Sequence, residues 1–285
     1  MRSSSPHTGV SRKLGTFTAT SIVIANMIGA GIFTTTGLMA GYLPSTGWIL
    51  ICWLFGGLIA LAGALCYMEL STRMPGEGGE YLYLKRLFHP IFGFLTGWTS
   101  LLVGFSAPIA ASALSFSEYM FAGLDIQPVT GDPSDLLLYK KITAIAIIII
   151  FTSIHYLGIR VGSVIQNILT VIKIAIVIGL AGIGINFSEN VISNIQFTGY
   201  DHNSGFMGIG VAMMLVMFSY SGWNASAYIA GEIKNPRRGL PRSLISGTLI
   251  VLVLYMLLNI FILNALTPEE MKNVIPVVEL ASVKT

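Results

Sequence analysis

Residues 25–33 read ANMIGAGIF, which places Gly29 and Gly31 two positions apart in the middle of a long apolar run. Glycine is common in membrane helices, where it lets two helices pack closely, so this stretch alone leaves close packing open. A break in the helix here would free backbone N–H and C=O groups in hydrocarbon. Each freed group costs several kcal/mol unless a partner binds it. The stretch is therefore a candidate site for a polar ligand.

A second interruption lies in the sixth apolar run, where residues 218–224 read FSYSGWN. Its polar side chains alone would also fit hydrogen bonding between helices. In a chain built from two five-helix repeats, however, the first and sixth runs would be corresponding members, and paired interruptions of this kind indicate a transporter binding site. The N-terminus of a half-helix suits a carboxylate, and the carbonyls at a C-terminus suit an ammonium. A zwitterionic amino acid carries both groups on one carbon.

The composition agrees with a membrane protein. The chain has 285 residues, of which 54% are hydrophobic and 10% charged, and its mean hydropathy is +0.76. A soluble domain carries about 25% charged residues. So few charges exclude a soluble enzyme and a disordered chain, and a scattered net charge of +3 excludes a nucleic-acid binder. The predicted fold class is an all-α polytopic membrane protein in the lipid bilayer.

Seven apolar runs are long enough to approach a full span. They are residues 17–42, 48–68, 91–122 (with a kink expected at Pro108), 142–157, 161–185, 206–230 and 244–263. Most lysines and arginines fall in the connecting segments that lie on the same side of the membrane as the N-terminus. The positive-inside rule then predicts a cytoplasmic N-terminus in a plasma (inner) membrane.

Four motifs together resemble the amino acid–polyamine–organocation (APC) family of permeases, closest to its neutral, L-type-like branch. They are GAGIF (29–33), YMEL followed by GGEY (67–70 and 78–81), FSYSGWN (218–224), and EIKNPRR followed by Leu240-Pro241 (232–238). The resemblance implies a LeuT-like inverted-repeat fold, discontinuous first and sixth helices, and amino acid transport by alternating access. It also implies that the chain is not an enzyme and needs no cofactor.

The resemblance divides the chain into four parts. Residues 1–16 would be a cytoplasmic tail, 17–185 the first five-helix repeat, 206–263 the first two helices of the second repeat, and 266–285 an extracellular segment. The family has ten core helices or more, whereas this chain has seven. We therefore expect a C-terminally truncated permease, and a non-transporting fragment stays open as an alternative.

The resemblance also assigns the binding residues. Main-chain groups of the first break would hold the substrate carboxylate, at Met27, Gly29, Ala30, Gly31 and Ile32. The second break would take the ammonium through carbonyls near Phe218, Ser219 and Ser221, with Tyr220 in the same stretch and Phe218 as a lid. Because neither break contains an acidic residue or an arginine, we expect a neutral amino acid. Proton symport and exchange both fit.

Lys173 lies in the middle of the fifth run and shares one helix face with Gln166 and Thr170. One interpretation is a structural lysine bonded to carbonyls of the broken first helix. The other is a proton-coupling group, because a fifth-helix lysine in proton-coupled APC members occupies the place where sodium-coupled relatives bind sodium. Charged residues inside a membrane are costly and often functional. The sequence therefore favours proton coupling through Lys173.

Two other classes of protein compete. A seven-helix receptor would match the number of spans but has no use for the two interruptions. An intramembrane hydrolase needs a nucleophile beside a base, and the sequence contains no G-x-S-x-G. His155 has no His, Asp or Glu at ligand spacing, so no metal site is expected.

Overall fold

The computed structural model describes residues 14–43, 45–74, 76–126, 133–156, 158–187, 196–197 and 202–284. Nearly all of the predicted tail, residues 1–16, lies outside these ranges. The described residues form helices and one isolated β-bridge, between Leu14 and Ile233. Six helical stretches are long and apolar enough to cross a membrane. The predicted all-α membrane architecture is thus confirmed at this level.

Both predicted interruptions are present. The first run forms α1 (Thr16–Met27) and α2 (Gly31–Met39), separated by residues 28–30. The sixth run, predicted over 206–230, does not form one long helix. It forms α9 (His202–Ser219), the one-turn helix α10 (Ala225–Tyr228) and the 3₁₀ turn η2 (Ala230–Glu232). The left-handed backbone of Gly222, with φ +97°, stops the helix between α9 and α10.

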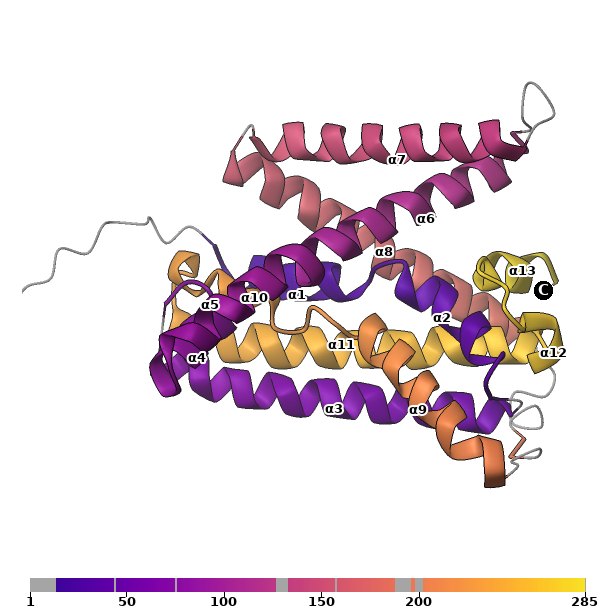
Figure 1. The fold of residues 1–285 in the computed structure, drawn as a ribbon, viewed down its shortest axis with the longest axis horizontal. Coiled ribbons are helices and arrows are strands. Elements are labelled where there is room, and N and C mark those ends of the chain that lie inside the picture. Colours follow the sequence, from indigo (N-terminus) through magenta and orange to yellow (C-terminus); the bar gives the residue numbers. More distant parts are fainter. Residues whose placement is uncertain are drawn as a thin grey trace, which may run out of the picture.

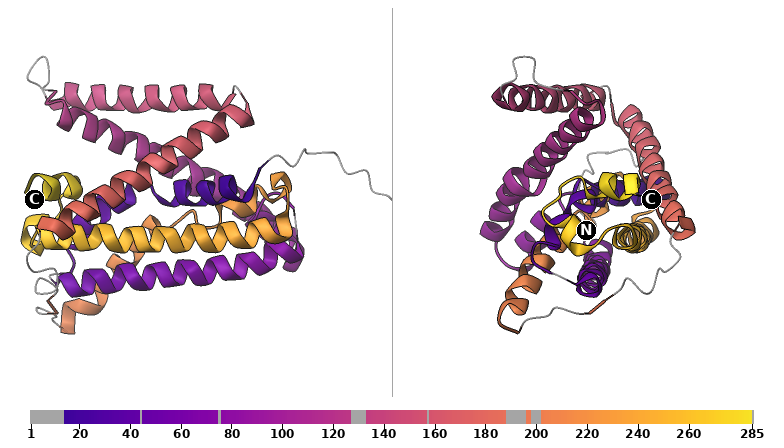
Figure 2. Two further views of the ribbon diagram at one scale, coloured as in Figure 1. Left: turned by 180° about the vertical axis from the view of Figure 1, so that it is seen from behind. Right: turned by 90° about the vertical axis from the view of Figure 1, so that its right-hand side faces the viewer.

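The remaining helices follow in chain order. They are α3 (Thr46–Arg73), α4 (Glu80–Leu87), α5 (Pro90–Thr99), the π-helix η1 (Ser100–Ser106), α6 (Ala107–Gly123), α7 (Pro133–Tyr156), α8 (Ile159–Phe187), α11 (Pro236–Ala265), α12 (Pro268–Met271) and α13 (Val277–Lys284). Helix α11 lies at the centre and packs against α1, α3 and α8, whereas α7 lies at the edge (Figures 1 and 2).

The kink expected at Pro108 takes the form of a wide helical turn. Proline has no N–H and its ring clashes with the carbonyl four residues earlier, here Gly104. The π-helix η1 ends just before Pro108 and makes the turn wider there. The Ser106 hydroxyl donates a hydrogen bond to the Leu101 carbonyl at 2.6 Å. Helices α5, η1 and α6 therefore continue as one span.

The fourth predicted span, residues 142–157, begins too late. Helix α7 starts at Pro133, and in the part before residue 142 it contacts α6 through Lys140. The Lys140 amine lies 2.5 Å from the Glu118 carboxylate, and the Ser117 hydroxyl donates to the Lys140 carbonyl at 2.9 Å. Lys140 and Lys141, the charged residues at which the predicted apolar span stopped, therefore lie within α7.

The buried core centres on three aromatic rings, from Trp53 on α3, Tyr220 after α9 and Tyr255 on α11. Their centroids lie 4.9–5.8 Å apart, in tilted or edge-to-face pairs. All three side chains are almost fully buried. This cluster holds the second break against α3 and α11, and so fixes its position in the bundle.

The predicted extracellular segment, residues 266–285, forms α12 and α13 in its described part, and both pack on α2. The Asn273 N–H donates to the Gly37 carbonyl at 3.0 Å. A Cβ on Gly37 would lie 2.0 Å from the Val274 carbonyl oxygen, so only glycine permits this approach. Helices α12 and α13 are thereby attached to the second half of the broken first helix.

We expect the contact between α12 and α13 to weaken in acid, because Glu270 of α12 pairs with Lys284 of α13. The Lys284 amine, 2.5 Å away, and the Thr267 N–H lower the pKa of Glu270 from 4.5 to about 2. Since the pKa is lowered in the folded chain, the stabilising contribution is complete above pH 4.5 and is lost as the pH falls toward 2. The thermal midpoint of wild type should therefore exceed that of Glu270→Gln near neutral pH. The two midpoints should converge as the pH approaches about 2.

The matched control is Glu269→Gln, because Glu269 forms no ion pair within the described residues. It should keep the pH dependence of wild type. A Glu270→Gln variant with the same pH dependence as wild type would contradict the role of the ion pair.

Candidate functional site

The first break exposes main-chain donors. Helix α1 ends at Met27, and Ile28, with ψ 86°, leads the backbone out of the helix. Helix α2 then restarts at Gly31. The N–H groups of Ala30, Gly31 and Ile32 make no hydrogen bond to the described residues, as is usual for the first turn of a helix. These donors carry the partial positive charge of the helix N-terminus and can bind an anionic group.

The second break lies directly against the first. A Cβ on Gly31 would lie 2.7 Å from the Ser219 hydroxyl, and one on Gly222 would lie 2.8 Å from the Asn26 carbonyl oxygen. The Thr35 and Ser219 hydroxyls are 2.7 Å apart. Two segments almost 200 residues apart in the sequence thus meet at several points, as the predicted pairing of the two interruptions requires.

The remaining predicted residues of the second break face different ways. The Phe218 side chain is 54% exposed, beside the place where α9 ends. Ser221 is exposed, and its N–H bonds the Phe218 carbonyl at 3.1 Å. The Tyr220 ring, in contrast, is buried between Trp53 and Tyr255. Only the main chain of Tyr220 lies along the break, while its side chain belongs to the core.

Lys173 contacts the end of α1. Its amine donates to the Ile28 carbonyl at 2.8 Å and reaches the Ala25 carbonyl at 3.5 Å. The Thr170 hydroxyl, one turn earlier on α8, lies 3.5 Å from the Ser21 carbonyl. The predicted shared face of α8 therefore lies along the first broken helix. Lys173 supplies donors to carbonyls that the break leaves without a helical partner, whereas proton transfer by Lys173 stays a prediction.

Sequence reasoning missed two residues of α11. The Tyr255 hydroxyl lies 2.5 Å from the Met27 carbonyl oxygen and 3.1 Å from that of Ser219. Asn259, one turn later, accepts a hydrogen bond from the Thr36 hydroxyl and donates to the Tyr255 carbonyl at 2.8 Å. The signal was present in the sequence, since two polar residues four apart share one face of an otherwise apolar helix.

Beyond the break, the sixth-helix segment is tied to α4. The Asn224 amide donates to the Glu80 carboxylate and, at 3.3 Å, to the Tyr228 hydroxyl. Trp223 packs edge-on against Tyr67 of α3, with ring centroids 4.8 Å apart. Burial and the negative charge of Glu80 raise the pKa of Tyr83, next to this cluster, to about 12, so the phenol stays neutral at physiological pH. The segment after the second break thus has fixed partners.

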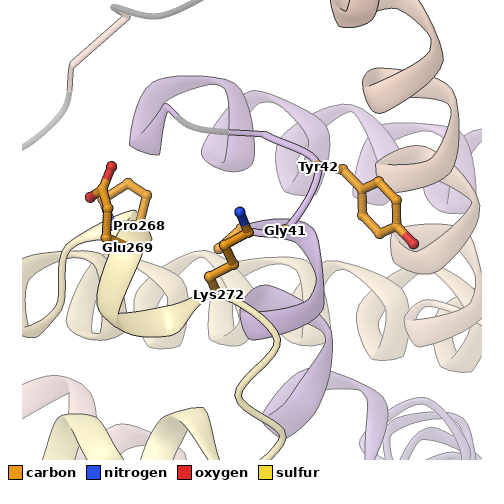
Figure 3. A pocket seen from close by; sticks show the side chains of 6 residues that line it. Gly41, Tyr42, Pro268, Glu269 and Lys272 are labelled. Atoms are coloured by element: carbon orange, nitrogen blue, oxygen red, sulfur yellow. The ribbon is translucent and has the colours of Figure 1, made fainter.

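A cavity of about 260 Å³ lies elsewhere, between the end of α2 and α12 (Figure 3). It is lined by Ala40, Gly41, Tyr42, Pro268, Glu269 and Lys272. No residue of either break lines this cavity, so it is separate from the site described above. The described residues contain no group of three or more His, Cys, Asp or Glu side chains able to hold a metal ion.

Comparison with known proteins decides the family. A family model described as "Amino acid permease" matches residues 14–283, almost the whole chain. The chain belongs to the amino acid permease family. The predicted resemblance to APC permeases is therefore confirmed, and so is the prediction that the chain is not an enzyme, since this is a family of transporters.

The permease resembles several curated transporters. It is 34% identical to the b(0,+)-type amino acid transporter 1 of Mus musculus over 265 residues, which are 93% of this chain and 53% of that protein. It is 30% identical to the serine/threonine exchanger SteT of Bacillus subtilis (strain 168), over 92% of the chain and 57% of SteT. It is 27% identical to the human Asc-type amino acid transporter 1, over 94% and 51%. The chain thus spans about half the length of these relatives.

The contact between the two breaks gives a first test. In Gly222→Ala, the added Cβ meets the Asn26 carbonyl oxygen and the residue must keep a left-handed backbone. We expect a loss of about 1–3 kcal/mol, seen as a lower thermal midpoint in detergent.

Gly210→Ala is the matched control, because no atom lies within 4 Å of its Cβ position on α9. It should melt at or above the midpoint of wild type, because alanine is the better helix former. Equal midpoints for the two variants would show that the breaks do not approach as closely as described.

Proposed function

We propose that the protein carries amino acids across the membrane by alternating access, and that the substrate binds between the two breaks. The observation that supports this most directly is the meeting of the two interrupted helices, because each leaves main-chain groups that a zwitterion can bind. Membership of the permease family supports the same activity. The comparison covers about half of each relative, so transport is proposed for this chain by analogy with those whole proteins.

The substrate carboxylate would bind the free N–H groups at the start of α2, on Ala30, Gly31 and Ile32. Met27 and Gly29 would frame this pocket through their main chains. The ammonium would bind carbonyls at the end of α9, near Phe218, Ser219 and Ser221, and the exposed Phe218 ring would close over the substrate. The partial charges of the two helix ends have the sign that each group needs.

The side chain of the substrate is proposed to be neutral. Residues 25–33 and 218–224 contain no acidic residue and no arginine that could pair with a charged side chain. One relative is named a serine/threonine exchanger. This name favours exchange over symport, and L-threonine is therefore the first substrate to test.

The fold and orientation proposed with this function are those of the family. Residues 17–185 would form the first five-helix repeat and 206–263 the first two helices of the inverted second repeat. The N-terminus would be cytoplasmic and residues 266–285 extracellular, in the plasma membrane. Two single-cysteine variants, Lys85→Cys and Lys272→Cys, test the orientation when each is treated with an impermeant thiol reagent in intact cells. Only the Lys272→Cys protein should react.

Exchange predicts trans-stimulation. In liposomes that contain the reconstituted chain, uptake of labelled L-threonine should be severalfold faster when unlabelled threonine is present inside. Gly31→Ala, whose Cβ would collide with Ser219, should abolish this stimulation because it separates α2 from α9. Uptake that does not depend on internal amino acid would contradict exchange, and the absence of any neutral amino acid uptake would contradict the proposed function.

Proton coupling through Lys173 is a second proposal, supported by the position of its amine at the α1 carbonyls. A Lys173→Ala variant should lose uptake driven by a pH gradient. Lys173→Arg separates the two interpretations, because arginine keeps its donors and its charge but does not release a proton. It should still fold and exchange amino acids but show no proton-driven uptake. Retention of proton-driven uptake in either variant would exclude Lys173 as the coupling group.

A further inference from the structure

The Tyr255 hydroxyl contacts the last residue of both α1 and α9. Its two neighbours, the carbonyl oxygens of Met27 and Ser219, belong to the last residues of α1 and α9. Each carbonyl carries the partial negative charge of a helix C-terminus. Tyr255 itself is 1% exposed and is held in the aromatic cluster with Trp53 and Tyr220. One rigid side chain therefore fixes two helix ends.

A hydroxyl has a single hydrogen, whereas each carbonyl oxygen can accept two hydrogen bonds. The hydrogen of Tyr255 can thus be fully used by only one of the two carbonyls at a time. The Met27 carbonyl also accepts from the Gly29 N–H at 2.9 Å, so it keeps a free lone pair only when Tyr255 donates to the Ser219 carbonyl. Unpaired polar groups are costly here because water is scarce. With the Tyr255 hydrogen on the Ser219 carbonyl, each of the two oxygens has one lone pair free for a further donor that approaches between them.

Three other contacts hold this arrangement from the α2 side. Ser219 pairs with Thr35 through their hydroxyls, and Thr36 donates to Asn259, whose amide in turn bonds the Tyr255 carbonyl. The side chains of Thr35, Thr36, Ser219 and Asn259 are all buried. The hydrogen bonds thus link α1, α2, α9 and α11, so the positions of the two carbonyls follow from the packing of four helices.

We propose that Tyr255 is a positioning residue for the substrate ammonium: it holds the terminal carbonyls of α1 and α9 side by side so that one amino group can bind both. The inference rests on the proposed function and extends it to a residue outside both breaks. In this role Tyr255 does not touch the substrate. It acts through the orientation of the Met27 and Ser219 carbonyls.

The test compares an amino acid with its analogue that lacks the amino group. The inhibition constants of L-threonine and 3-hydroxybutanoate are measured against labelled threonine uptake, in liposomes with the reconstituted 285-residue chain. Tyr255→Phe keeps the ring but removes the hydroxyl. We expect the constant for threonine to rise about tenfold, which corresponds to about 1.4 kcal/mol. The constant for 3-hydroxybutanoate and the maximal rate should stay within about twofold, since neither depends on the ammonium contact.

Thr248→Val is the matched control on the same helix. The Thr248 hydroxyl is also fully buried but has no hydrogen-bond partner among the described residues, so its loss should change neither constant. The thermal midpoint of each variant without substrate reports any loss of folding. A parallel rise of both constants in Tyr255→Phe, or no rise in either, would overturn the inference while leaving transport in place. If wild type transports no neutral amino acid, the proposed function and this inference fail together.

Discussion

The structure depends on one constraint: a backbone polar group inside a membrane must find its partner within the protein or in a ligand. Two helices of this chain break in mid-span and so lose the partners that an unbroken helix provides. The surrounding helices replace some of them. Lys173 of α8 donates to the Ile28 carbonyl, and Tyr255 of α11 lies against the carbonyls of Met27 and Ser219. The N–H groups at the start of α2 have no such replacement among the described residues, and these are the donors proposed to bind the substrate carboxylate.

Close approach of the two breaks requires small residues as much as polar ones. Gly31 faces Ser219 and Gly222 faces Asn26 with no room for a methyl group. This contact lets the groups released by one break lie within reach of those released by the other. Glycine therefore has two roles here, since it weakens the helix where the break occurs and also leaves space for the second break.

The sequence predicted the features that depend on local chemistry. The glycines of residues 29–31 and the polar stretch 218–224 indicated both interruptions, and an isolated lysine in an apolar span indicated a polar partner for Lys173. It did not predict the role of Tyr255 and Asn259, because a polar residue in a membrane helix has no partner that spacing alone identifies. The start of α7 was missed for a similar reason. The Lys140 amine pairs with Glu118 and the Lys140 carbonyl accepts from Ser117, both on another helix, which hydropathy along one segment cannot show.

The β-bridge between Leu14 and Ile233 has a consequence for how the molecule can move. It joins the start of α1 to the residue after η2, through hydrogen bonds of 3.0 Å on each side of Leu14, and α1 also packs on α10. On the other side of the breaks, α2 packs on α9 and carries α12 and α13. Residues 28–30 and 220–224 thus separate α1 and α10 from α2 and α9, while α11 packs on both α1 and α13, and α3 packs on both α9 and α11. A change of backbone angles in these short connections would therefore tilt α1 with α10 against α2 with α9 only if these helices also shift along α3 and α11.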